Sequence, residues 1–250
     1  MADADDYDRH YDRDWWRAPM ADSLARKRAR TARSALAQPG DAFLIVTEGT
    51  VTEPHYFDRL RGLLSLKAIH IRIEPGEASD PRRLIEQAAA FVRDHARRAK
   101  RDTLRIDEPQ RYDHVFAVID TDVAQRQGHW NDIVQLAQAR RVQLAHSSPC
   151  FEYWLLLHIA YSTRTDLLDG PAAKHAVKQA IRCDYDKSAD TLRAAIDGLV
   201  DKWPQAVVHA ERVAQHHAGA GTPIPANPST EVSRLVRALN DAAPSHARKL

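Results

Sequence analysis

From residue 42 onward, short apolar runs alternate with segments in which apolar residues recur at helical spacing. The continuous run Phe43–Val46 predicts a strand that is buried on both faces, as in a parallel sheet. Tyr56, Phe57 and Leu60 share one face of the helix that should follow it. The predicted strands cover residues 43–46, 68–73, 114–119 and 142–145, and the predicted helices between them cover residues 54–66, 81–99 and 130–140.

After Pro149 the spacing of the apolar residues is helical almost throughout, and three prolines exclude a continuous helix over residues 222–228. The predicted helices here cover residues 151–159, 172–181, 188–199, 204–217 and 230–239. The pattern predicts the α/β class, with a parallel sheet flanked by helices and followed by a mostly helical C-terminal extension. We place the α/β domain at residues 41–160 and the helical region packed on it at residues 161–250.

Residues 1–40 differ from the rest because acids alternate with arginines and aliphatic residues are few, which indicates a mobile charged arm. Over all 250 residues, 36 Lys and Arg nearly balance 34 Asp and Glu, so nucleic-acid binding would have to depend on local basic patches. No segment has the pattern of a secretory signal or of a membrane span, and two cysteines make no disulfide framework. We therefore expect a soluble, cytoplasmic protein without membrane contact.

Acidic residues follow two of the predicted strands. Glu48 comes after the first strand, and Asp120 and Asp122 come after the third. Because ligands of open parallel sheets bind outside the carboxyl ends of the strands, these carboxylates should share one crevice. Carboxylate oxygens together favour Mg²⁺ or Mn²⁺. For the aspartates, hydrogen bonding within a turn is an equally open interpretation, and Glu53 fits the positive end of a helix better than a metal site.

Four blocks of sequence resemble the RloB-like family, whose fold resembles the Toprim domain. The blocks are Phe43–Gly49 with Thr52–Phe57, Val118–Asp122, Ser148–His158 and Asn227–Val232. The resemblance covers roughly residues 42–239, and the block that begins at Ser148 is its most distinctive part. This sequence departs from the family pattern at Thr50-Val51, at Val123 and at Ser148.

The resemblance implies a metal-dependent endonuclease of the Toprim type, which acts on DNA or RNA in bacterial abortive-infection defence against phage and works beside an ATPase partner. By the same resemblance, Glu48 would be the general base or a metal ligand, and Asp120 and Asp122 would hold Mg²⁺. The sequence leaves open whether the substrate is DNA or RNA and whether the chain forms a homo-oligomer.

Further residues have a functional and a structural interpretation. Glu152 is either another metal ligand or a first-turn acid favoured by the helix dipole. Lys187 could stabilise the transition state of phosphoryl transfer, although an exposed, solvated lysine is the commoner case. A basic group at the two ends of one predicted helix could grip a nucleic-acid backbone, or could simply be solvated. This group consists of Arg82, Arg83, Arg97, Arg98 and Lys100.

Two other functions remain open from the residues. Asp120 could be the nucleophile of a phosphatase of the haloacid dehalogenase type, with Asp122 shuttling a proton, although that motif normally lies on the first strand. Alternatively, the chain could be a catalytically degenerate binding or regulatory subunit whose helical half docks on an ATPase.

Overall fold

The computed structural model describes residues 41–66, 71–75, 80–105, 108–122, 124, 128–182 and 188–250. The expected arm at residues 1–40, Val123 and Lys187 lie outside these ranges.

The centre of the protein is a five-stranded sheet with the strand order β2-β1-β3-β4-β5. The four parallel strands are β1 (Phe43–Thr47), β2 (Ile71–Pro75), β3 (His114–Asp120) and β4 (Gln143–Ser148). A fifth strand, β5 (Ser229–Thr230), pairs antiparallel with the end of β4. The sequence places these two residues in or beside a helix, because a two-residue strand has no periodicity of its own to detect.

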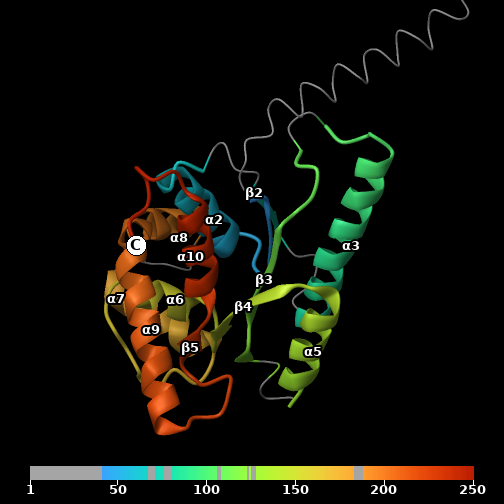
Figure 1. Ribbon diagram of the computed structural model, residues 1–250. Helices are drawn as coiled ribbons and strands as arrows, with labels where there is room; N and C mark the ends of the chain where they lie inside the picture. Colours follow the sequence, from blue (N-terminus) through green and yellow to red (C-terminus); the bar gives the residue numbers. More distant parts are fainter. Residues whose placement is uncertain are drawn as a thin grey trace, which may run out of the picture.

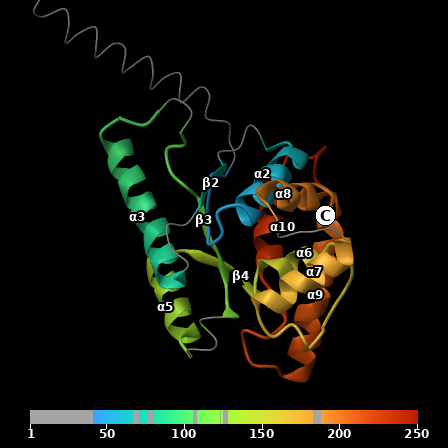
Figure 2. The ribbon, with the colours of Figure 1, turned by 180° about the vertical axis from the view of Figure 1, so that it is seen from behind.

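Helices cover both faces of the sheet, which confirms the predicted fold class (Figures 1 and 2). One face carries α3 (Pro81–Lys100) and α5 (Trp130–Arg140). The opposite side holds the remaining described helices, which are α2 (Thr52–Leu63), α6 (Phe151–Leu157), α7 (Gly170–Ile181), α8 (Ala189–Asp197), the 3-10 turn η2 (Val200–Lys202), α9 (Trp203–Ala220) and α10 (Val232–Ala242).

Side chains of β1 alternate between two hydrophobic clusters, as the two-residue period of a strand requires. Leu44 and Val46 pack toward α3 and α5. Phe43 and Ile45 join the larger cluster on the other face, which runs without a break from β1 to Ala243 at the end of α10. The parallel sheet and the C-terminal helices therefore share one core, and this core fixes α6 against the sheet.

All seven side chains of α6 are buried, so this short helix lies inside the helical layer. His158 follows it and is also fully buried. The imidazole of His158 is hydrogen-bonded to the Tyr56 hydroxyl at 3.0 Å and to the Trp154 carbonyl oxygen at 3.0 Å. Because both ring nitrogens are engaged and desolvation lowers its pKa to about 4, His158 is a structural residue.

Candidate functional site

Glu48 and Asp120 meet at the carboxyl ends of two neighbouring parallel strands. The backbone N–H of Glu48 donates to the Val118 carbonyl oxygen at 3.0 Å, which extends the β1–β3 ladder by one residue. The Glu48 side chain then crosses the end of β3, where its Oε2 accepts the Asp120 N–H at 3.0 Å. The fold therefore brings together the two acids that the sequence places at separate strand ends.

Asp120 is also held by the helix that follows the neighbouring strand. Its Oδ1 accepts the N–H of Phe151, the first residue of α6, at 2.9 Å. An N–H at a helix start has no partner within the helix, and the positive end of the helix dipole favours a carboxylate there. The end of β3 and the start of α6 thus fix the position of this carboxylate.

Glu53 also belongs to this acidic cluster, although the sequence favours a place for it at the positive end of a helix. Glu53 is only 6% exposed, and its Oε1 accepts the Gly49 N–H at 3.0 Å. A Cβ atom on Gly49 would lie 2.0 Å from Glu53 Oε2, so the carboxylate occupies space that only glycine leaves free. Position in the first turn of α2 does not account for this burial. The usable signal in the sequence is a glycine four residues before an acid, in a turn that ends a strand.

Glu152 and Asp122 border the cluster from two other elements. Glu152, in the first turn of α6, is 5% exposed, and its charge acts on both Glu53 and Asp120. Asp122 lies toward α7, because a Cβ atom on Gly170, the first residue of that helix, would be 4.0 Å from Asp122 Oδ2. Its charge acts on Glu48. Four elements therefore direct carboxylates toward one edge of the sheet.

Burial and mutual repulsion oppose the ionised forms of these acids. Burial, aided by the charges of Glu53 and Asp122, raises the pKa of Glu48 to about 7, although the Asp120 N–H stabilises the anion. Burial also raises the pKa of Glu53 to about 7, and the charge of Glu152 adds to that rise. Burial, together with the charges of Glu48 and Glu53, raises the pKa of Asp120 well above its ordinary value. The cluster therefore binds protons more readily than isolated carboxylates do, and it would be stabilised by a cation.

The donors suit a hard divalent cation. Within the described ranges, no three His, Cys, Asp or Glu side chains form a group arranged to hold a metal ion. Mg²⁺, however, usually binds through only one or two carboxylates and keeps several waters. The adjacent carboxylates of Glu48 and Asp120 meet that smaller requirement, so the residues present fit Mg²⁺ or Mn²⁺ by charge and donor type.

The predicted basic residues separate into two groups along α3. Arg82 and Arg83 lie in the first turn of the helix, which begins after the carboxyl end of β2 and so at the same edge of the sheet as Glu48. Arg82 Nη2 donates to Asp132 Oδ2 at 2.9 Å. The second group lies about 25 Å further along the helix, because an α-helix rises ~1.5 Å per residue. This group is Arg97, Arg98 and Lys100.

Arg98 and Lys174 each act on a nearby acid. Arg98 is engaged, because its guanidinium donates to both carboxylate oxygens of Glu108, at 2.8 Å and 2.5 Å. Lys174, on α7, is a described cation near the acidic cluster, since its charge lowers the pKa of Glu53. Lys187, for which a cationic role is one of two interpretations of the sequence, lies outside the described ranges.

No described helix combines the length and the apolar character that crossing a membrane requires. Neither the curated proteins nor the solved structures include a match to this chain. A comparison with known families matches residues 43–239 to the family described as RloB-like protein. This match covers most of the chain and includes every block that carries the resemblance in the sequence. The chain therefore belongs to the RloB-like family.

Proposed function

We propose that this protein hydrolyses phosphodiester bonds of DNA or RNA at the carboxyl edge of its sheet, with Mg²⁺ or Mn²⁺ as cofactor. The observation that carries the proposal is the contact between the Glu48 carboxylate and the N–H of Asp120, at 3.0 Å. This contact holds two acids together although burial and like charge disfavour their ionisation. Such an arrangement is costly in a folded chain and is typical of sites that bind cations or transfer protons.

The residues of the cluster would have different roles in binding the cation and in proton transfer. Asp120 and Glu48 would hold the cation, with Asp122 and Glu152 beside them. When bound, the cation would polarise a phosphate and make an attacking water more acidic. Glu48 Oε2 is fixed by the Asp120 N–H, whereas Oε1 forms no hydrogen bond with a described residue. With a pKa of about 7, Glu48 can also accept a proton near neutral pH, so the role of general base is open to it.

The substrate would be a nucleic-acid strand that passes the start of α3. Arg82 and Arg83 are at this edge and suit the position of phosphate contacts. A strand that followed α3 would reach Arg97 and Lys100 about 25 Å away. The proposal therefore assigns these four residues to backbone binding without sequence selectivity, and substitutions there should reduce the salt dependence of binding.

The family resemblance adds a partner and a biological role to the proposal. RloB-like chains resemble nucleases that act with an ATPase in defence against phage, and we extend this role to the present protein. Affinity purification of the tagged chain from its native host should recover an ATPase. Recovery of the chain without an ATPase, at expression levels that support defence, would remove this part of the proposal.

The catalytic proposal is tested with the purified full chain, labelled single- and double-stranded DNA, and RNA, each with Mg²⁺, Mn²⁺ or a chelator. Cleavage should require the divalent ion and should fall about 100-fold or more in Glu48→Gln and in Asp120→Asn. Glu211→Gln is the matched control, because Glu211, on α9, pairs with Arg237 of α10. Full cleavage activity in either cluster variant would refute the assignment.

No observation favours the two alternative functions over this one. The nucleophile of an Asp120-dependent phosphatase would normally lie on the first strand, whereas Asp120 ends the third strand along the chain. Its Oδ1 is also already engaged, because it accepts the Phe151 N–H. That function predicts turnover of small phosphomonoesters and an aspartyl-phosphate at Asp120. A purely regulatory subunit predicts neither reaction and a stable complex with the ATPase.

A further inference from the structure

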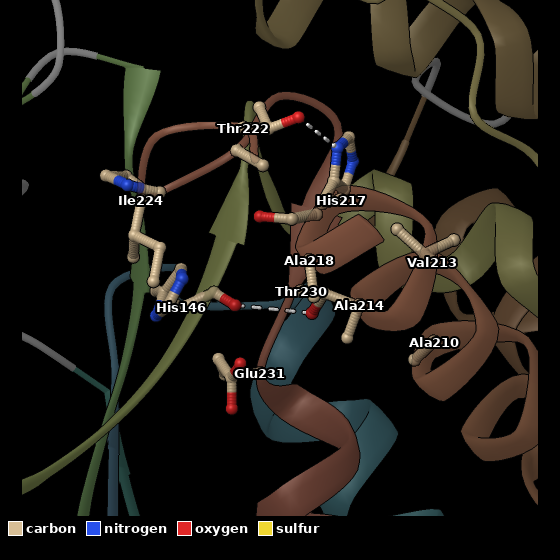
Figure 3. Close-up of a pocket in the computed structure, with 13 residues that line it drawn as sticks. His146, Ala210, Val213, Ala214, His217, Ala218, Thr222, Ile224, Thr230 and Glu231 are labelled. Atoms are coloured by element: carbon tan, nitrogen blue, oxygen red, sulfur yellow. Dashed lines mark hydrogen bonds between the residues drawn. The ribbon is translucent and has the colours of Figure 1, made fainter. Parts of the chain in front are cut away.

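We propose that a pocket beside the acidic cluster, bordered by β4, α9 and residues 222–231, binds one unstacked nucleobase. This inference rests on the proposed function for its biological meaning, since the base would belong to the nucleic acid that is cut. The pocket has a volume of about 160 Å³ and is shown in Figure 3.

The walls of the pocket are apolar and small. Ala210, Ala214 and Ala218 follow one another at helical spacing along α9 and contribute only methyl groups. Ile224 faces them from the connecting segment and is 82% exposed, although it is large and apolar. In the view of Figure 3, His146 and Ile224 lie on one side, and His217 with the α9 residues lies on the other. A space between methyl-bearing walls suits a flat, weakly hydrated ring.

The polar group that points to a specific ligand is His146. His146 is only 9% exposed, and its ring forms an edge contact with the Trp130 ring at a centroid distance of 4.8 Å. No described residue is hydrogen-bonded to its ring nitrogens, although a buried imidazole normally has partners. Burial and the nearby charge of Arg234 lower its pKa to about 4, so the ring is neutral at physiological pH. It then offers one donor and one acceptor.

The other polar groups are mostly engaged, which narrows the ligand class. His217 is bonded to the Pro228 carbonyl oxygen at 2.8 Å and to Thr222 Oγ1 at 3.3 Å. Thr230 Oγ1 donates to the His146 carbonyl oxygen and contacts Ser147 Oγ at 2.9 Å. Glu231 also lines the pocket, and its Oε2 lies 3.5 Å from Nη1 of Arg234. A neutral donor and acceptor beside a carboxylate match the edge of a nucleobase, which presents ring nitrogens and exocyclic amino or carbonyl groups.

The pocket is close enough to the acidic cluster to hold a base of the strand being cut. Asp120 is in register with Ser147 on β4, and Ser147 is in register with Thr230 on β5. Since neighbouring strands are about 4.8 Å apart, the pocket begins roughly 5–10 Å from Asp120. Enzymes that act on nucleic acid often take a nucleotide out of its stack into such a pocket, and thereby select a base next to the reacting group.

The test compares the wild type with three variants of the full chain. Ala214→Trp fills the pocket from α9. His146→Phe keeps a ring against Trp130 but removes the donor and the acceptor. Gln215→Trp is the matched control, because Gln215 is exposed on the same helix and does not line the pocket.

The first measurement is saturation-transfer NMR with the four nucleosides in the presence of a chelator, so that cleavage plays no part. At least one nucleoside should receive transfer at its base protons in the wild type and in Gln215→Trp. The affinity should fall about tenfold or more in His146→Phe, and binding should be lost in Ala214→Trp. Absence of transfer from every nucleoside, or undiminished binding to Ala214→Trp, would overturn the inference.

The second measurement separates this inference from the proposed function. Products of cleavage of a random-sequence strand should show a base preference at one position near the cut in the wild type, and His146→Phe should flatten it. Nucleoside binding in the pocket without any cleavage would remove the nuclease proposal and keep the binding site. Cleavage whose base preference is the same in Ala214→Trp and in the wild type would remove the nucleobase site and keep the nuclease proposal.

Discussion

Replacement of Glu53 by glutamine should change the pH dependence of stability in a direction that the buried cluster dictates. Glu53 is 6% exposed, its carboxylate is held against Gly49, and the charge of Lys174 only partly offsets the rise in its pKa. Glutamine keeps the shape of the side chain and can keep the acceptor for the Gly49 N–H, but it never ionises. The substitution therefore removes the electrostatic cost of Glu53 with little change in packing.

The sign and size of the effect follow from the pKa values. Below pH 4.5, Glu53 is protonated in both the folded and the unfolded chain, so its contribution to stability is fully present. Between pH 4.5 and about 7, the unfolded chain releases this proton and the folded chain retains it, so the free energy of unfolding falls as the pH rises. At ~1.4 kcal/mol per tenfold change in proton affinity, a pKa raised from 4.5 to about 7 corresponds to a loss of roughly 3 kcal/mol above neutral pH.

The assay is urea unfolding of the wild type and of Glu53→Gln at several pH values from about 5 to about 8, with a chelator present. The variant should be more stable than the wild type at the upper end by a few kcal/mol, and the two should converge at the lower end. Glu211→Gln provides the control for a carboxylate outside the cluster. Parallel stability curves for Glu53→Gln and the wild type across this range would refute the electrostatic account of the site.

Three further outcomes are expected. Millimolar Mg²⁺ should raise the melting temperature of the wild type at neutral pH, and should raise it less in Glu48→Gln, as calorimetry would show; an equal rise in both would contradict binding at the cluster. Gly49→Ala should destabilise the chain by about 1–3 kcal/mol in urea, since its Cβ would lie 2.0 Å from Glu53 Oε2, whereas Gly62→Ala in the last turn of α2, where a Cβ would meet nothing within 4 Å, should stabilise it by about 0.5–1 kcal/mol. Tyr56→Phe should cost about 1–3 kcal/mol of unfolding free energy, because His158 Nε2 loses its buried partner; an unchanged denaturation midpoint would show that the bond contributes nothing.

The main elements of the fold were predictable because each buries an apolar face of sufficient length. The periodic pattern predicted α5 with its observed bounds, Trp130–Arg140, and predicted α3 to within one residue of its end. Asp80 accepts the Arg82 N–H at 3.0 Å and Pro81 begins the helix, so this start was encoded locally. β5 was not predictable, since Ser229–Thr230 become a strand only when β4 offers them an edge.

The candidate site was predictable in outline and not in its inner arrangement. Glu48 and Asp120 could be placed together because both follow strands of a parallel sheet. The burial of Glu53 depends on a turn that folds its carboxylate onto Gly49, and a sequence pattern does not describe such a contact. The pocket at His146 likewise depends on α9 and β5, which are remote from β4 in the sequence.

The burial of α6 has a consequence for how this protein can be shortened. The first N–H of α6 holds Asp120, while the side chains of α6 are enclosed by α7 and α9 from the last third of the chain. A fragment that ended after β4 and α6 would expose six apolar side chains of α6 to water, and the helix whose first N–H holds Asp120 would lose its packing. The acidic cluster at the strand ends and the packing of the C-terminal helices should therefore be lost together on truncation.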